Sequence, residues 1–259
     1  LAAAFSILTM QAVTWVERGL RWLPLPRWLQ PAIGGLLVSA VAVAVPQVLG
    51  AGHGAIQLVF DGSFTLGMLA VLLVAKLVAS ALSLGAGFRG GMFSSSLLLG
   101  CLFGALFADL ARLVAPDLVS QPSLMMMVGM GAVAASVIGA PFTMVFLILE
   151  GTGNFPVMVA VLVGVVVAST IVRLTFGFSF STWRFHQRGV GIHSPHDVGW
   201  LADLTVGRLM RADPKLVSAA MPLAELIEMH PPGHGKGVFV VSETGTFIGP
   251  LDAAAVHQA

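Results

Sequence analysis

Long apolar segments alternate with short polar ones along the first two thirds of the chain. The apolar segments cover residues 32–49, 64–84, 92–108, 123–138, 142–149 and 157–172. Several are shorter than the roughly 20 residues that a helix needs to cross a bilayer. Irregular backbone at membrane depth is tolerated only where it is buried in protein or lines a polar cavity. The pattern therefore predicts an all-α polytopic membrane protein with broken or partial helices, a construction typical of ion transporters.

The polar residues gather toward the two ends of the chain. Residues 1–16 are expected to be the tail of a helix that begins further upstream. The segment ERGLRWLPLPRWLQP that follows combines arginines, tryptophans and prolines as membrane–water interfaces do. From Asp203 onward, alternation and turn residues predict a small α+β unit with a helix over about Met221 to His230 and a strand over Gly237 to Ser242. The expected divisions are 1–30 (helix end and interfacial linker), 31–190 (transmembrane helices), 191–202 (linker) and 203–259 (α+β unit).

Composition supports insertion in a lipid bilayer. The chain is 57% hydrophobic and 10% charged, with a mean hydropathy of +0.93, whereas a soluble domain carries about a quarter charged residues. The net charge of +1 gives no support for nucleic-acid binding. The single Cys101 excludes an internal disulfide and a cysteine-based metal cluster. Few charged residues lie between Pro31 and Val172: Asp61, Lys76, Arg89, Asp109, Arg112, Asp117 and Glu150.

The stretch GAGFRGGMFSS, residues 85–95, joins two of the apolar segments. A helix that begins near Met92 presents unpaired backbone N–H groups and the positive end of its dipole. Together these form an anion site that needs no cationic side chain, and the glycines let the backbone approach a ligand. A tight interhelical turn explains the same spacing equally well, so both interpretations stay open on these residues alone.

Two longer stretches carry a family resemblance. GGMFSSSLLLGCLFGALFADL resembles the part of the CLC chloride channel and transporter family where a G-x-F-x-P motif begins an anion-binding helix. VGMGAVAASVIGAPFTMVFLILEGTGNFPVMVAVLVGVVVAST is similar to the family's helices near the dimer interface. The likeness runs from about Pro31 to Gly189, and the tail resembles a single CBS module. It implies the second inverted repeat of a CLC-like fold, with chloride as the transported substrate and no enzymatic activity.

The same resemblance implies the site residues. Gly91, Met92 and Phe93 match the motif, with the amides of Met92 and Phe93 as anion donors, and Gly90 lies beside them. Ser95 replaces the usual proline. The family's anion-contacting tyrosine has no counterpart, since the chain contains no tyrosine. Ser181 stands at the matching position, where it either contacts the anion or caps a helix ahead of Trp183.

Charged and polar side chains near this stretch have alternative explanations. Arg89 either raises the local potential for anions or extends its head group to the interface, and we predict that substitutions at Gly90 and Gly91 weaken anion binding more than Arg89→Gln does. Lys76 either faces the bundle interior or snorkels. Glu150 is expected at a helix end near the subunit interface. His53 is expected to be a loop or interface histidine.

The resemblance further implies a homodimer. The sequence leaves several other properties open. We expect a multi-pass protein of the bacterial inner membrane with a cytoplasmic C-terminal unit. The glutamates that separate channels from antiporters belong to the other half of the fold. Adenine nucleotide binding by the CBS-like unit is a hypothesis, because such modules work in pairs. Alternatives are a divalent-cation transporter with CBS units, for which the carboxylates are too scattered, and a membrane regulatory protein without transport. We expect no metal site.

Overall fold

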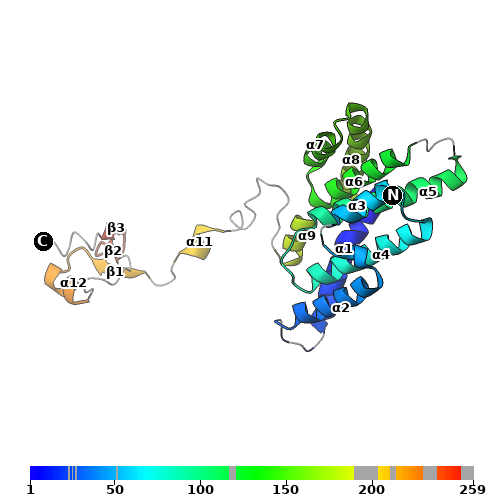
Figure 1. Ribbon diagram of the computed structural model, residues 1–259. Helices are drawn as coiled ribbons and strands as arrows, with labels where there is room; N and C mark the ends of the chain where they lie inside the picture. The colour runs from blue at the N-terminus through cyan, green and yellow to red at the C-terminus, as the bar shows by residue number, and fades with distance from the viewer. Residues whose placement is uncertain are drawn as a thin grey trace. The chain divides into compact units, whose positions relative to one another are not determined.

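The computed structural model describes residues 1–22, 24, 26, 28–50, 52–116, 121–189, 204–210, 214–229 and 238–251. Contacts divide the chain into two compact units, Leu1–Asp197 and Val198–Ala259. The first unit is helical and the second carries the strands (Figure 1). The predicted linker over 191–202 lies outside the described residues.

The helices of the first unit differ in length as the apolar segments do. Among the described residues, three stretches are long and apolar enough to cross a membrane: Leu66–Gly85, Phe93–Val114 and Phe155–Gln187. The predicted all-α membrane fold is confirmed. The elements are α1 (Ala2–Trp22), α2 (Gln30–Ala44), the 3-10 helix η1 (Pro46–Val48), α3 (His53–Phe60), α4 (Leu66–Gly85), α5 (Phe93–Val114), α6 (Pro122–Ile138), α7 (Pro141–Thr152), α8 (Phe155–Thr175) and α9 (Phe180–Gln187).

Two local predictions near the start of the chain are wrong. Residues 17–22, expected in the interfacial linker, continue α1, because the i,i+4 pair of Glu17 and Arg21 (2.6 Å) and the buried Leu20 favour helix up to the prolines. For His53 the loop alternative is wrong, because this residue is the exposed first residue of α3. Gly52 precedes it with φ +84°, a left-handed conformation that allows a sharp entry into the helix.

Proline and glycine set the turns between α6, α7 and α8. Each of these helices has a proline at its first or second position, and α6 and α7 each end at a left-handed glycine, Gly139 (φ +82°) and Gly153 (φ +60°). The side chain of Asn154 then caps α8 by accepting from Val157 N at 3.2 Å. The three helices therefore follow one another with short turns and pack together.

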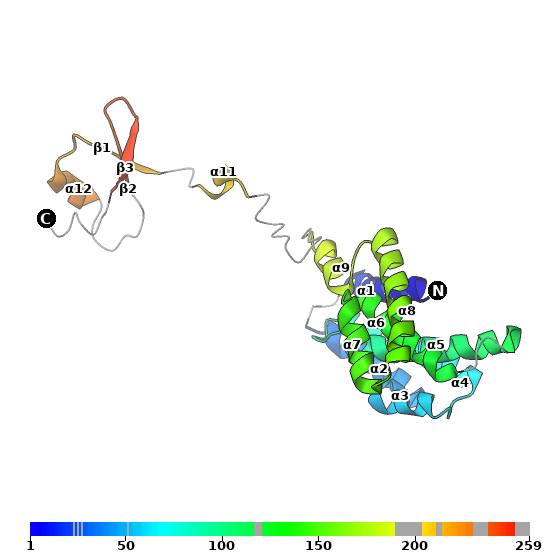
Figure 2. The ribbon, with the colours of Figure 1, turned by 90° about the horizontal axis from the view of Figure 1, so that it is seen from above.

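Helix α6 is the centre of the helical unit. It contacts α1, α5, α7, α8 and α9, and Figures 1 and 2 show the other helices arranged around it. Its approach to α5 is very close, since a Cβ on Gly100 would lie 2.5 Å from the carbonyl oxygen of Gly129. Glycine at positions 100 and 104 of α5 therefore lets the two helices approach closely. This packing fixes the start of α5 relative to the end of α6.

Lys76 of α4 faces the interior of the bundle. Its side chain is 4% exposed, and its Nζ donates to the carbonyl oxygens of Val48 (2.8 Å) and Gly50 (3.0 Å). These carbonyls follow α2, where the chain turns toward α3 and regular helix bonding is lost. The cation therefore stabilises an irregular turn against α4, and the snorkelling alternative is wrong.

Replacing Lys76 with methionine is expected to destabilise the helical unit by at least ~3 kcal/mol, because two carbonyls lose a charged donor. Thermal unfolding of the full chain in detergent measures this. Leu73→Met, at an 8% exposed position one turn earlier on α4, is the matched control and is expected to change little. Equal unfolding temperatures for Lys76→Met and the parent would contradict the assigned contacts.

The second unit is a small α+β structure, as predicted. It contains α11 (Val206–Leu209), β1 (Lys215–Ser218), α12 (Leu223–Met229), β2 (Val238–Val241) and β3 (Phe247–Leu251). Strand β2 lies in the middle, parallel to β1 and antiparallel to β3. Val217, Leu226 and Val238 form its core. The helix is shorter than the predicted range about Met221 to His230, and His230 and Gly237 lie outside the described residues.

Candidate anion site

Five of the predicted site residues line a single cavity. Gly90, Gly91, Met92, Phe93 and Ser181 surround a volume of about 370 Å³. The start of α5, the end of α6 and helix α9 form its walls. The remaining lining residues are Ile138, Phe180, Arg184, Phe185 and Arg188. Segments far apart in the sequence thus converge on one site.

The first turn of α5 presents unpaired amides. Its first helical hydrogen bond runs from Ser96 N to Met92 O at 2.8 Å, so the amides from Met92 through Ser95 have no acceptor within the helix. No side chain caps Met92. The Met92 side chain is 3% exposed and packs in the core with Leu84 and Val133. Core packing therefore holds the helix start in place and leaves its N–H groups available.

Gly90 and Gly91 have open space beside them. A Cβ on Gly90 would approach no atom more closely than 3.9 Å, and one on Gly91 none closer than 4.0 Å. Packing therefore does not require glycine at either position. A side chain added there would project beside the cavity, so its main effect is on access to the amides.

Helix α9 supplies a second N-terminus to the cavity. Ser179 is its N-cap and forms a capping box with Thr182, in which Ser179 N donates to Thr182 Oγ1 at 2.8 Å. The capping alternative for Ser181 is therefore wrong. Ser181 is the second helical residue, exposed, and lines the cavity.

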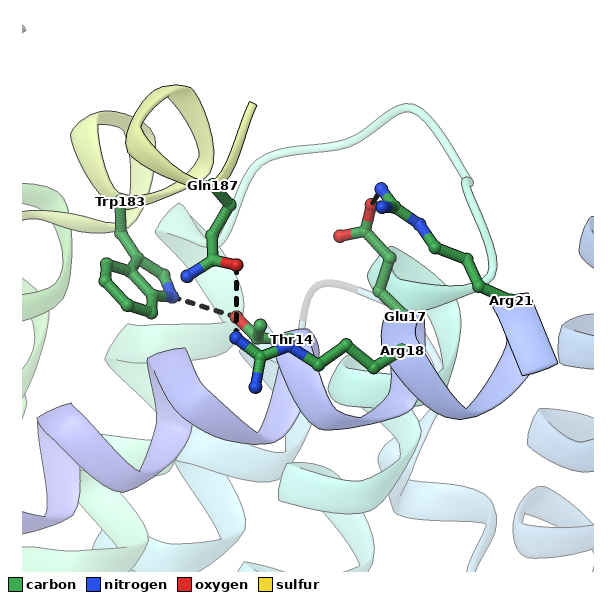
Figure 3. A network of polar contacts seen from close by, with 6 residues as sticks. All are labelled: Thr14, Glu17, Arg18, Arg21, Trp183 and Gln187. Atoms are coloured by element: carbon green, nitrogen blue, oxygen red, sulfur yellow. Dashed lines mark hydrogen bonds and ion pairs between the residues drawn. The ribbon is translucent and has the colours of Figure 1, made fainter. Parts of the chain in front are cut away.

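Polar contacts hold α9 against α1. In Figure 3, Trp183 and Gln187 of α9 point toward Thr14 and Arg18 of α1. Trp183 Nε1 donates to Thr14 Oγ1 at 2.8 Å, and Arg18 donates to Gln187 Oε1 at 3.2 Å. The indole also packs on Phe176 with ring centroids 4.7 Å apart. These contacts fix α9 while Ser181 and Arg184 line the cavity.

Replacing Trp183 with phenylalanine is expected to weaken anion binding about three- to tenfold, because α9 loses a hydrogen bond of roughly 1 kcal/mol that positions its N-terminus. Calorimetric titration of the full chain with chloride measures this. Trp15→Phe, at a 55% exposed tryptophan of α1, is the matched control and is expected to leave the affinity unchanged. If both variants bind chloride with the affinity of the parent, Trp183 does not position the N-terminus of α9 for anion binding.

Sequence reasoning missed two arginines of the site. Arg184 and Arg188 line the cavity together with Ser181. Ser181, Arg184 and Arg188 are spaced by three and four residues, which is the spacing of one helix face. This spacing was the sequence signal that could have identified the two arginines. Arg184 also lies over the Phe180 ring, with its Cζ 5.8 Å from the centroid. Two guanidinium groups raise the potential of the cavity for anions.

Two other candidates are not among the residues that line this cavity. Arg89 is exposed, and Ser95 is half-buried in the first turn of α5. Within the described part of the chain, no group of three His, Cys, Asp or Glu residues is placed to hold a metal ion.

Comparison with known proteins assigns the family. The family model described as "Voltage gated chloride channel" matches residues 1–173. The chain belongs to this family. The predicted CLC membership is thereby confirmed, and the match covers the helices that form the α5 and α6 walls of the cavity.

Several relatives in this family have names that describe an ion exchange activity. The H(+)/Cl(-) exchange transporter ClcA of Vibrio campbellii is 33% identical over 143 residues, which cover 54% of this chain and 30% of that protein. ClcA of Vibrio cholerae is 32% identical over 131 residues, covering 51% of this chain and 28% of that protein. The chain thus spans about a third of the length of these relatives.

Solved CLC structures share the fold. A eukaryotic CLC transporter superposes with a TM-score of 0.71 at 22% identity, covering 100% of this chain and 47% of that one. A slow cyanobacterial Cl-/H+ antiporter gives a TM-score of 0.62 at 21% identity, covering 73% of this chain and 44% of that one. The CLC fold of the chain therefore rests on structure as well as sequence.

Proposed function

We propose that the chain is part of a transporter or channel that moves chloride across the membrane, with the anion held by the amides of Met92 and Phe93 and by Ser181. The observation that carries this proposal is the convergence of these residues on one cavity. Two helix N-termini and two arginines contribute to its walls, and the described part of the chain places no carboxylate among its lining residues.

The chemistry of the cavity suits transient anion binding. Amides at a helix start and the helix dipole stabilise negative charge. The apolar side chains of Ile138, Phe180 and Phe185 lower the local dielectric and so strengthen these interactions. Arg184 and Arg188 attract anions toward the site. Conduction also needs binding that is weak enough for release, and the backbone dipoles of the helix starts carry only partial charges.

The names of the Vibrio relatives support coupling of chloride to protons as one form of this activity. A homodimer is the proposed assembly. Helices α7 and α8 expose large apolar side chains, among them Phe146 (62%), Phe155 (64%) and Val163 (60%), where a second subunit or lipid replaces water. Arg184 and Arg188 precede the second unit, which favours a cytoplasmic C-terminus in a bacterial inner membrane.

Chloride flux tests the proposal. The full-length protein is reconstituted in liposomes loaded with chloride, and efflux is followed with and without a pH gradient, against protein-free liposomes. We expect chloride efflux. Proton movement coupled to chloride identifies an exchanger, and uncoupled flux identifies a channel. No anion flux under either condition rejects the proposal and favours a regulatory membrane protein.

The second unit is proposed to act as a CBS-like regulatory module. Its β1-α12-β2-β3 order supplies one α+β unit, and a partner unit would complete a cleft for an adenine nucleotide. Calorimetry of the full chain with millimolar ATP tests this. The absence of binding heat rejects nucleotide regulation and leaves the transport proposal intact.

A further inference from the structure

A second cavity lies between α6, α7, α8 and α9. Its volume is about 500 Å³, and it shares no lining residue with the chloride cavity. A water molecule takes roughly 30 Å³ of liquid, so the cavity has room for a species larger than a single water. Apolar side chains such as Phe142, Leu162 and Val166 form part of its wall, and serines, threonines and an arginine form the rest.

Two buried hydroxyls in this wall have no partner among the described residues. Ser136 is 3% exposed, and neither its Oγ nor the buried Oγ of Ser169 makes a hydrogen bond. Six other helical serines and threonines of this unit donate their hydroxyls to the carbonyl four residues earlier: Ser6, Thr9, Thr14, Ser39, Thr152 and Thr175. Ser136 and Ser169 depart from this pattern, and both line the cavity. An unpaired buried hydroxyl requires an explanation, and a bound water or ion is one of those that apply.

The other polar groups of the cavity are donors. Helix α7 begins there at Pro141 without a side-chain cap, so the amides of its first turn, including that of Phe142, have no acceptor within the helix. Arg173, in the last turn of α8, is the one charged residue among the described residues that line the cavity. No carboxylate is among them. The electrostatic character of the cavity is therefore suited to an anion.

We propose that this cavity binds a phosphate group, either free or as the head group of a phospholipid. A guanidinium group matches the spaced oxygens of phosphate, and a helix N-terminus is a favourable phosphate partner. Ser136 and Ser169 donate to further phosphate oxygens. Both sources of the phosphate fit, since the apolar wall residues can also contact acyl chains.

Two probes distinguish the sources. Inorganic phosphate is titrated into the full chain in detergent, with gluconate at equal ionic strength as the reference, and thermal unfolding is recorded. Phosphatidylglycerol is added in a native mass-spectrometry experiment, with diacylglycerol, which lacks the phosphate, as the reference. Stabilisation by inorganic phosphate supports a free-phosphate site. Selective retention of phosphatidylglycerol alone supports a lipid head-group site.

The variants Ser136→Ala and Ser169→Ala are expected to weaken binding of the effective probe roughly tenfold or more each, since each removes a hydrogen bond to a charged group. Without phosphate they should unfold at or above the temperature of the parent, because each removes an unpaired buried hydroxyl. Ser6→Ala is the matched control, since Ser6 is fully buried and its hydroxyl is bonded within α1. Chloride binding in the first cavity should not change in any of the three.

Several outcomes overturn the proposal. If neither probe binds, the cavity holds water only. If Ser6→Ala weakens the probe as much as Ser136→Ala does, the effect is not local. If the serine variants lose chloride binding and phosphate binding together, the two cavities are not independent and the assignment fails. An absence of chloride flux in the unmodified protein would reject the proposed transport function, but it would not test phosphate binding in the second cavity.

Discussion

Phe93→Pro will weaken chloride binding by the full chain about ten- to a hundredfold, because it removes one amide donor from the first turn of α5. Phe93 is the first helical residue, a position where proline is well tolerated. Calorimetric titration with chloride measures the affinity. Phe93→Leu keeps the amide and should retain most of the binding, which separates the loss of the N–H from the loss of the ring.

Ser95→Pro is the sharper control. It also places a proline in the first turn of α5, and any strain on the preceding residue is of the same kind. Ser95 is not among the residues that line the cavity. Chloride affinity should stay close to that of the parent in Ser95→Pro, and Arg89→Gln should have a smaller effect than Phe93→Pro. Equal losses in the two proline variants would show that helix distortion, and not a specific amide, is responsible.

Gly129→Ala will destabilise the helical unit by about 3 kcal/mol, at the upper end of the effect of overpacking. The added Cβ would lie 2.5 Å from Gly100 O and 2.8 Å from Gly104 Cα, and both are backbone atoms that cannot turn away. Helices α5 and α6 must then move apart. Chloride affinity should also fall, because α6 carries Ile138 into the cavity wall.

Gly67→Ala on α4 is the matched control for this variant. A Cβ on Gly67 meets nothing within 4 Å, so alanine should be neutral or stabilise the helix by up to about 1 kcal/mol. Both variants are compared by thermal unfolding in the same detergent. Equal unfolding temperatures for Gly129→Ala and Gly67→Ala would show that α5 and α6 separate at little cost.

Much of the cavity proposed to bind the anion was predictable because its main element is local. The glycines, Met92 and Phe93 are adjacent, and a helix start exposes its amides whatever packs around it. Ser181 was found through family resemblance, and the exclusion of a capping role for it needed the observed capping of α9 by Ser179. Arg184 and Arg188 were missed as site residues, since their spacing shows a shared face but not what that face meets.

The sequence by itself determined the helical membrane class, the partial helices and the small α+β unit, because apolar length, proline and glycine act over a few residues. Tertiary structure decided what lies far apart along the chain. It placed Lys76 under the carbonyls after α2, joined Trp183 to Thr14 across 169 residues, and left two serines of α6 and α8 unpaired around a second cavity. Such contacts depend on how whole helices pack, and helix packing is set by the summed shape of many side chains, which no local pattern encodes.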